Sequence, residues 1–363
     1  MARPNFLIIV ADDLGFSDLG CFGSEINTPN LDKLAESGVR FTDFHTASAC
    51  SPTRAMLLSG VDHHKSGLGQ MNEFANKAKP NIWKDKEGYE GVLNNRVAAI
   101  SEILNQKENN ESDKGIYKTI LSGKWHLGLE KPYLPSNRSF ERTFCVLNGA
   151  ANHFKYTPDL GDRLCPATRS KLQIKFTQIF YSNIITSLAL WEENGKLFNM
   201  NDLPDDFYST DAFADKLIEF LDEDDDKERP FFSLLTFTAP HWPLQAKREL
   251  INKYHGVYDQ GPIELRNKRL ERLKKLGLVS NDIEAHPMVN LFGSNTWNEL
   301  SIEERQISSR NMEVYAAMVE SIDINVGKVI DYLKENNKFE DTIILFMSDN
   351  GAEGKLFRIA IKI

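Results

Sequence analysis

The stretch Phe6-Leu7-Ile8-Ile9-Val10-Ala11 is apolar without interruption and leads directly into Asp12-Asp13-Leu14-Gly15. Such a run is typical of a strand that is buried on both faces of a parallel sheet. Open α/β sheets bind their ligands at the carboxyl ends of these strands. Two adjacent carboxylates at that position require a nearby cation. The stretch therefore predicts an α/β fold, and it favours a metal site over the alternative of a solvated turn.

Length and composition set the scale of the fold. The chain has 363 residues, of which 41% are hydrophobic, so it can bury a large core. Its formal net charge is −9, and it contains no block of lysine or arginine. This pattern argues against a nucleic-acid or membrane-surface partner. We therefore expect a single large α/β domain or a domain with an appendage, in which any anionic substrate is attracted by a local site.

The cysteines indicate the redox compartment. Four of them, Cys21, Cys50, Cys145 and Cys165, show neither the density of a disulfide framework nor Cys-x-x-Cys metal spacing. This favours a reducing compartment, and we expect a cytoplasmic protein. The apolar run at 6–11 is too short for a membrane helix and lacks a small-residue cleavage site, so a buried strand explains it better.

Three further predicted strands also end in polar or charged residues. They cover 117–122, 231–238 and 342–347, and they lead to Lys124-Trp125-His126, Pro240-His241 and Ser348-Asp349-Asn350-Gly351. We also expect a short strand at 39–44 and helices at 29–37, 97–106, 211–222 and 311–334, the last from its apolar spacing of three and four. Residues 132–204 are irregular and harder to place.

The segment from Ser48 to Gly60 contains a candidate nucleophile. Cys50 precedes Ser51-Pro52, a pair that suits the first turn of a helix. A helix N-terminus favours a thiolate, a bound anion or a developing oxyanion, and Arg54 adds a cation one turn further on. The competing interpretation is a small buried residue that merely precedes a helix.

Together these groups suggest one chemistry. Asp12, Asp13, Asp349 and Asn350 form an all-oxygen set that suits calcium or magnesium and not zinc. Positive and proton-transferring groups would surround position 50, namely Arg54, Lys124, His126 and His241. This combination resembles a site for an ester of a strong oxyacid, where a metal and cations neutralise charge that develops on oxygen.

Several motifs resemble those of the sulfatases, which belong to the alkaline-phosphatase-like superfamily. Cys50-Ser51-Pro52-Thr53-Arg54 with Leu58-Ser59-Gly60 matches the family's cysteine motif, and residues 115–128 resemble its second motif. Asp12-Asp13, Pro240-His241, Asn194-Gly195-Lys196, 312–320 and 348–351 also correspond. The resemblance extends to Gly354 and is closest to microbial arylsulfatases. It implies a mostly parallel central sheet flanked by helices.

The resemblance also implies a mechanism. Cys50 would be oxidised to formylglycine by a maturing enzyme, and the hydrated aldehyde would attack the sulfur of a small-molecule sulfate ester. A covalent sulfate ester would form and the alcohol or phenol would leave, after which the second hydroxyl of the hydrate would let sulfate be expelled. Asp12, Asp13, Asp349, Asn350 and the modified residue 50 would hold calcium, in preference to magnesium. Arg54 and Lys124 would steady the hydrate and the sulfate, His126 would take a proton as sulfate leaves, and His241 would protonate the leaving group.

The end of the sequence departs from the family pattern. Family members continue beyond the aspartate-asparagine-glycine motif with a further anion-binding lysine, more sheet and a C-terminal subdomain. We therefore expect a catalytic domain at 1–354, a divergent tail at 355–363, exposed apolar surface and impaired activity. Two alternatives to a sulfatase remain: a metal-dependent phosphatase or a phosphonate or phosphodiester hydrolase, and an inactive truncated paralogue that only binds metal and anion.

Overall fold

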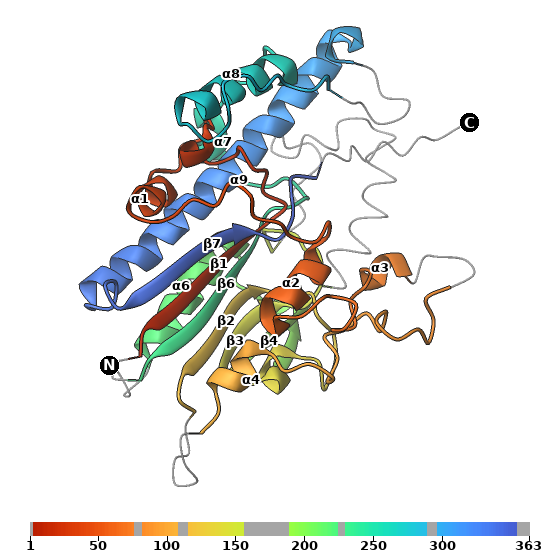
Figure 1. Cartoon of the computed structure of the whole chain (residues 1–363), viewed down its shortest axis with the longest axis vertical. Coiled ribbons are helices and arrows are strands. Elements are labelled where there is room, and N and C mark those ends of the chain that lie inside the picture. Colours follow the sequence, from red (N-terminus) through yellow and green to blue (C-terminus); the bar gives the residue numbers. More distant parts are fainter. Residues whose placement is uncertain are drawn as a thin grey trace.

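A seven-stranded sheet lies at the centre of the computed structural model, which describes residues 3–75, 82–107, 115–155, 189–223, 229–288 and 296–353 (Figure 1). The strands lie in the order β5-β4-β3-β2-β6-β1-β7. Their bounds are β1 Asn5–Asp12, β2 Lys118–Lys124, β3 Arg142–Val146, β4 Leu190–Glu193, β5 Lys196–Asn199, β6 Phe231–Pro240 and β7 Thr342–Ser348. The neighbouring strands in the series β3-β2-β6-β1-β7 all pair in parallel, whereas β4 is antiparallel to both β3 and β5. The predicted α/β fold with a mostly parallel sheet is confirmed.

The first strand lies between two strands that come much later in the chain. Ile8 is paired with Leu234 of β6 on one side and with Leu345 of β7 on the other. β1, β2 and β6 are buried almost throughout, as the long apolar runs of β1 and β6 predict for those two strands. Their carboxyl ends therefore lie side by side at one edge of the sheet.

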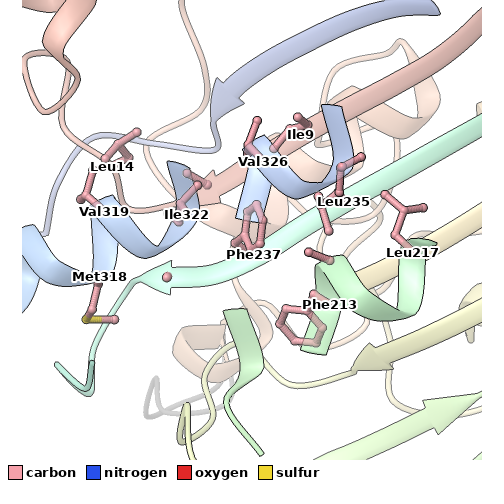
Figure 2. Close-up of a cluster of buried hydrophobic side chains, with 14 of the residues drawn as sticks. Ile9, Leu14, Phe213, Leu217, Leu235, Phe237, Met318, Val319, Ile322 and Val326 are labelled. Carbon is pink, nitrogen blue, oxygen red and sulfur yellow. The ribbon is translucent and has the colours of Figure 1, made fainter. Parts of the chain in front are cut away.

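Two long helices cover one face of the sheet. These are α6 (Ser209–Asp222) and α9 (Ile302–Glu335). Figure 2 shows the resulting core, in which Phe213 and Leu217 of α6 and Ile322 and Val326 of α9 surround Leu235 of β6. The predicted helix at 311–334 begins earlier than expected. It begins after Ser301, whose hydroxyl accepts from the Glu304 N–H while the Glu304 carboxylate accepts from the Ser301 N–H.

The remaining helices cover the other face of the sheet and the outside of α9. α2 (Cys50–Ser59) and α4 (Ile100–Leu104) contribute to a second apolar cluster, separate from the core that α6 and α9 cover, together with Val10 and Leu121 of the sheet. α1 (Pro29–Ser37) and α7 (Arg248–Lys253) pack against α9, and α8 (Pro262–Lys275) lies beyond them (Figure 1). The short helices are α3 Asn72–Ala75, η1 Gly20–Phe22, η2 Pro135–Arg138, η5 Met200–Asp202 and η6 Trp297–Glu299. None of the helices within the described ranges has the length and hydropathy needed to cross a membrane.

The short strand expected at 39–44 is wrong. These described residues form no strand, and the side chains of Val39, Phe41 and Phe44 are 77%, 64% and 58% exposed. Apolar residues are also exposed on β7, which forms one edge of the sheet and presents Ile343 and Leu345. The helix expected at 97–106 is shorter, since α4 covers only Ile100–Leu104. The predicted tail at 355–363 lies outside the described residues.

Candidate active site

Five elements deliver the predicted site residues to the carboxyl edge of the sheet. Asp12 ends β1 and Lys124 ends β2, while His241 follows β6 and Asp349 follows β7. Since β2, β6, β1 and β7 are consecutive neighbours, these residues lie at one end of adjacent strands. Cys50 is the first residue of α2, which packs on the same face as Val10. The structure therefore brings these side chains together from positions spread over the whole chain.

A compact group of potential metal ligands lies at this edge. One ligand atom each from Asp12, Asp13, Cys50 and His241 can be chosen so that all four lie within 4.8 Å of one another. Asp12 is 0% exposed and Asp13 is 5% exposed. Two carboxylates this deeply buried are stable only when cations or hydrogen-bond donors face them.

Two buried cations partly neutralise the carboxylates. The Lys124 ammonium lies 2.6 Å from Oδ2 of Asp12, and the Arg54 guanidinium contacts Oδ2 of Asp349 through Nε at 2.9 Å and Nη2 at 2.8 Å. Arg54 Nη1 also donates to the Lys124 carbonyl at 2.9 Å. Gly123 makes this packing possible, because its φ is 128° and a Cβ there would collide with the Thr236 carbonyl of β6.

These contacts shift the proton affinities of the carboxylates in opposite directions. Burial acts to raise the pKa of Asp12, but Lys124, His241 and Arg54 outweigh it and hold that pKa below its ordinary value. Burial and the charge of Asp12 raise the pKa of Asp349 in spite of Arg54. Lys124 stays charged, because Asp12 raises its pKa against the effect of burial. Of these two carboxylates, Asp12 is thus the more firmly ionised.

The residues fit a hard divalent cation. Three carboxylates face two cations, so one negative charge is left over. Within the described part of the chain, Asp12 Oδ1 and Asn350 Oδ1 are buried oxygens without a hydrogen-bond partner. Such orphaned acceptors are rare and indicate an ion or water. The Asn350 amide lies against Asp13 through Nδ2, and turning that amide over would present its oxygen to the same place. An all-oxygen set of this kind suits calcium.

Cys50 begins helix α2, as the sequence predicts, and its thiol is buried. The side chain is 6% exposed, and burial raises the pKa of its thiol to about 12, with Lys124 opposing and the carboxylates adding to the rise. The thiolate is therefore almost absent at neutral pH, and it is the thiolate that is nucleophilic. The competing prediction, that residue 50 is buried, is confirmed by its small exposed fraction. The side chains around it are charged, however, which an ordinary apolar core would not provide.

His126 lies next to the cation cluster in a constrained conformation. Its φ is 60°, so the chain after Lys124 is not extended, and its Nε2 lies 3.2 Å from Oε1 of Glu73 in α3. Burial lowers the pKa of His126, although Glu73 opposes this. Burial would raise the pKa of Glu73, but the contacts with His126 lower it to about 2. An ionised Glu73 accepts the Nε2–H, which leaves Nδ1 with a lone pair.

The backbone carbonyl of His241 contacts a second histidine, His153. Nε2 of His241 lies 3.6 Å from Oδ2 of Asp13, and its backbone carbonyl lies 3.0 Å from Nε2 of His153. Burial lowers the pKa of His153 to about 4, so this imidazole is neutral. Its Nε2 carries the proton and donates to the carbonyl, while Nδ1 lies 3.1 Å from the Ser209 hydroxyl.

The same chain matches a family model across almost its entire length. The model is described as Sulfatase, and it covers residues 4–358. The chain belongs to the sulfatase family. An uncharacterized sulfatase of Schizosaccharomyces pombe is 48% identical over 354 residues, which are 98% of this chain and 58% of that protein. An arylsulfatase of Klebsiella aerogenes is 34% identical over 354 residues, or 96% of this chain and 66% of that protein.

Solved sulfatase-like structures share the fold. The crystal structure of Ps i-CgsB in complex with k-i-k-neocarrahexaose is 28% identical and has a TM-score of 0.61, covering 97% of this chain and 59% of that one. The chain thus spans roughly three fifths of the length of these three proteins.

Two neighbours of the candidate site are not predicted from the sequence. Glu73 precedes His126 by 53 residues and sits on a helix of four residues, so no periodicity points to it. His153 follows Asn148-Gly149-Ala150-Ala151-Asn152, which indicates only a tight backbone passage. Both residues reach the site through tertiary packing, which no local pattern encodes.

Proposed function

We propose that this sulfatase-family chain hydrolyses sulfate esters to an alcohol or phenol and inorganic sulfate. One observation carries the proposal. Cys50, at the position of the family's cysteine motif, shares a group of ligand atoms within 4.8 Å with Asp12, Asp13 and His241. Buried Arg54 and Lys124 contact the carboxylates of that site. Carboxylates, fixed cations and two histidines are the groups that transfer of a strongly anionic ester requires.

Two groups complete the proposed site. Calcium would be held by Asp12, Asp13, Asp349, Asn350 and residue 50, and when bound it supplies positive charge opposite the oxygens that gain negative charge. Calcium is preferred to magnesium because magnesium usually keeps several waters and avoids cages made entirely of protein ligands. Formylglycine made from Cys50 by a maturing enzyme supplies the attacking oxygen. The buried thiol, with its pKa of about 12, supports a precursor role for the cysteine itself.

The cations of the chain bind and orient the sulfate group. Lys124 is 1% exposed and Arg54 is 3% exposed, so neither is screened by bulk water. Both remain protonated, because nearby carboxylates raise the pKa of each against burial. Their contacts with Asp12 and Asp349 also fix their direction, which lowers the reorganisation needed when an anion binds.

The two histidines divide the proton transfers. His126 accepts a proton at Nδ1, because its Nε2–H is engaged by Glu73. His241 protonates the departing oxygen from the side of Asp13. Ester cleavage with a poor leaving group needs one group that removes a proton and another that supplies one, and here the two histidines follow different strands, β2 and β6.

Turnover of matched aryl esters tests the reaction. Aryl sulfate and aryl phosphate with the same phenol would be compared on one preparation, after mass spectrometry of the Cys50 peptide has measured conversion to formylglycine. We expect hydrolysis of the sulfate in proportion to the converted fraction. A clear preference for the phosphate ester would favour a phosphatase or phosphonate hydrolase instead. Calcium binding without turnover in fully converted protein would favour the non-enzymatic alternative.

The cellular location follows a separate line of reasoning. Cys21, Cys50 and Cys145 are free thiols among the described residues. We keep the cytoplasm as the proposed location on the basis of cysteine usage.

A further inference from the structure

A buried network connects α8 and α9 to the loop that carries Asp13. Arg269 of α8 is 8% exposed, and its Nη1 contacts Oδ1 of Asp18. The other carboxylate oxygen of Asp18 accepts from the Tyr315 hydroxyl of α9 at 2.7 Å and from the Gly15 N–H at 2.9 Å. Glu25 holds the far side of the guanidinium at 2.7 and 2.8 Å. No residue of this network is among the proposed ligands or proton-transfer groups.

The network ends on a backbone segment that needs outside support. Asp13 has a φ of 63°, a left-handed conformation that is unfavourable for a residue with a Cβ. Its carbonyl lies 3.3 Å from the Tyr315 hydroxyl, and its N–H donates to Oδ1 of Asp349 at 3.2 Å. The single Tyr315 proton goes mainly to the nearer Asp18. Tyr315 therefore acts on the loop largely through Asp18 and the Gly15 N–H.

Packing and close approach make the arrangement specific. Tyr315 and Val319 are four residues apart and lie on the same face of α9. Val319 shares the apolar cluster with Leu14, the residue directly after Asp13 (Figure 2). A Cβ on Gly15 would collide with the Asp18 carboxylate, so glycine is required for the hydrogen bond at that point. One face of α9 thus fixes both the residue after Asp13 and the backbone that follows.

We propose that Tyr315, Asp18 and Arg269 are positioning residues for the cation site, holding Asp13 in its strained conformation so that its carboxylate stays beside Asp12. This inference rests on the proposed function, because it assumes that Asp12 and Asp13 bind calcium. Groups that orient metal ligands typically change metal affinity by about 10- to 100-fold when they are removed. The network is therefore expected to control calcium affinity without touching the ion.

Calcium titration of two tyrosine variants tests the proposal. Tyr315→Phe keeps the ring and removes the hydroxyl from Asp18. Tyr254→Phe is the matched control, since Tyr254 is buried and donates to Glu320 at 2.8 Å, away from the loop. By isothermal titration calorimetry with calcium chloride on the full chain, Tyr315→Phe should weaken binding by about 10- to 100-fold. Tyr254→Phe should leave the dissociation constant within about twofold of the unmodified chain.

Several outcomes separate this inference from the proposed function. Equal calcium affinity in Tyr315→Phe and the unmodified chain would overturn the positioning role alone. An equal loss in both variants would assign the network a merely structural role and also overturn it. If the unmodified chain binds no calcium, the metal site fails and the inference fails with it. Asp18→Asn, which keeps an oxygen for the Gly15 N–H but loses the charge facing Arg269, should give a weakening in the same direction.

Discussion

Nε2 of His126 lies 3.2 Å from Oε1 of Glu73, and this contact assigns the single proton of a buried imidazole to one nitrogen. The second nitrogen, Nδ1, is buried and has no hydrogen-bond partner within the described part of the chain. A carboxylate that fixes the tautomer of a histidine in this way determines which nitrogen is available as a base. Glu73 therefore bears on reactivity although it is half-exposed.

Replacing Glu73 by Gln should lower kcat/KM by roughly tenfold, which is less than the about 10²–10⁴-fold that a general base contributes in total, because the imidazole itself remains. The Glu73 charge raises the pKa of His126 against burial, so its loss lowers that pKa further. Because the neutral imidazole is the active form, the acid limb of the pH–rate profile should move to lower pH. Glu87→Gln, at a surface carboxylate near Arg96, should leave the profile in place. A shift of the acid limb to higher pH would contradict this assignment.

Glu73 also makes stability depend on pH. Its pKa falls from an ordinary value of 4.5 to about 2 in the folded chain, since the contacts with His126 outweigh burial. A depressed carboxyl pKa stabilises the fold above the unfolded value, and this contribution is lost as pH falls from about 4.5 toward 2. Thermal unfolding should show Glu73→Gln less stable than the unmodified chain at pH 7, with the gap closing near pH 2.

Removal of the Arg54 charge should be strongly destabilising. Arg54→Met leaves the carboxylate of Asp349 buried without its partner, and breaking a buried pair on one side costs about 3–5 kcal/mol. Arg96→Met, at an exposed pair with Glu90, should change stability by only about 0–1 kcal/mol. Urea unfolding of both variants in calcium-free buffer measures the difference. Equal effects of the two substitutions would show that Asp349 is neutralised in another way.

Calcium should raise the melting temperature of the unmodified chain. A ligand present at 100 times its dissociation constant stabilises the folded state by about 2.7 kcal/mol. Asp12→Asn removes a buried ligand candidate whose pKa is held below its ordinary value, and it should abolish the shift. The shift should also shrink as pH falls, because protons compete with the cation for Asp349, whose pKa is already raised by burial and Asp12. Scanning fluorimetry with calcium and with chelator measures each of these effects.

The edge of β7 should promote self-association. Leu345 is 46% exposed on β7, which within the described part of the chain pairs with a strand on one side only, a combination that favours strand addition. Leu345→Lys should slow aggregation, as measured by light scattering on heating. Leu129→Lys changes a residue of similar exposure, 43%, that is not in a strand, and it should have little effect. Unchanged aggregation in Leu345→Lys would place the association surface elsewhere.

The sequence predicts four strands of the sheet and the residues that follow them, because the mainly apolar stretches at 6–11, 231–238 and 342–347 and the shorter one in 117–122 lead to polar or charged residues. Asp12, Lys124, His241 and Asp349 all follow this rule. The strand expected at 39–44 fails because alternating apolar residues form a strand only where a neighbour accepts their hydrogen bonds. The β4–β5 hairpin had a usable signal in Asn194-Gly195, whose φ values of 48° and 82° suit a tight two-residue turn. The Tyr315 and Glu73 contacts depend on packing between distant segments, which local patterns do not carry.

The position of β1 between β6 and β7 also has a consequence during translation. Asp12 and Cys50 leave the ribosome early, yet the partners of this corner of the sheet, Phe231–Pro240 and Thr342–Ser348, are made much later. At about 5–20 residues per second, roughly 300 residues take about 15–60 s to synthesise. For that interval Cys50 has no completed site around it. The order in which the strands are made therefore gives an interval in which the proposed conversion of residue 50 can precede the proposed binding of a cation.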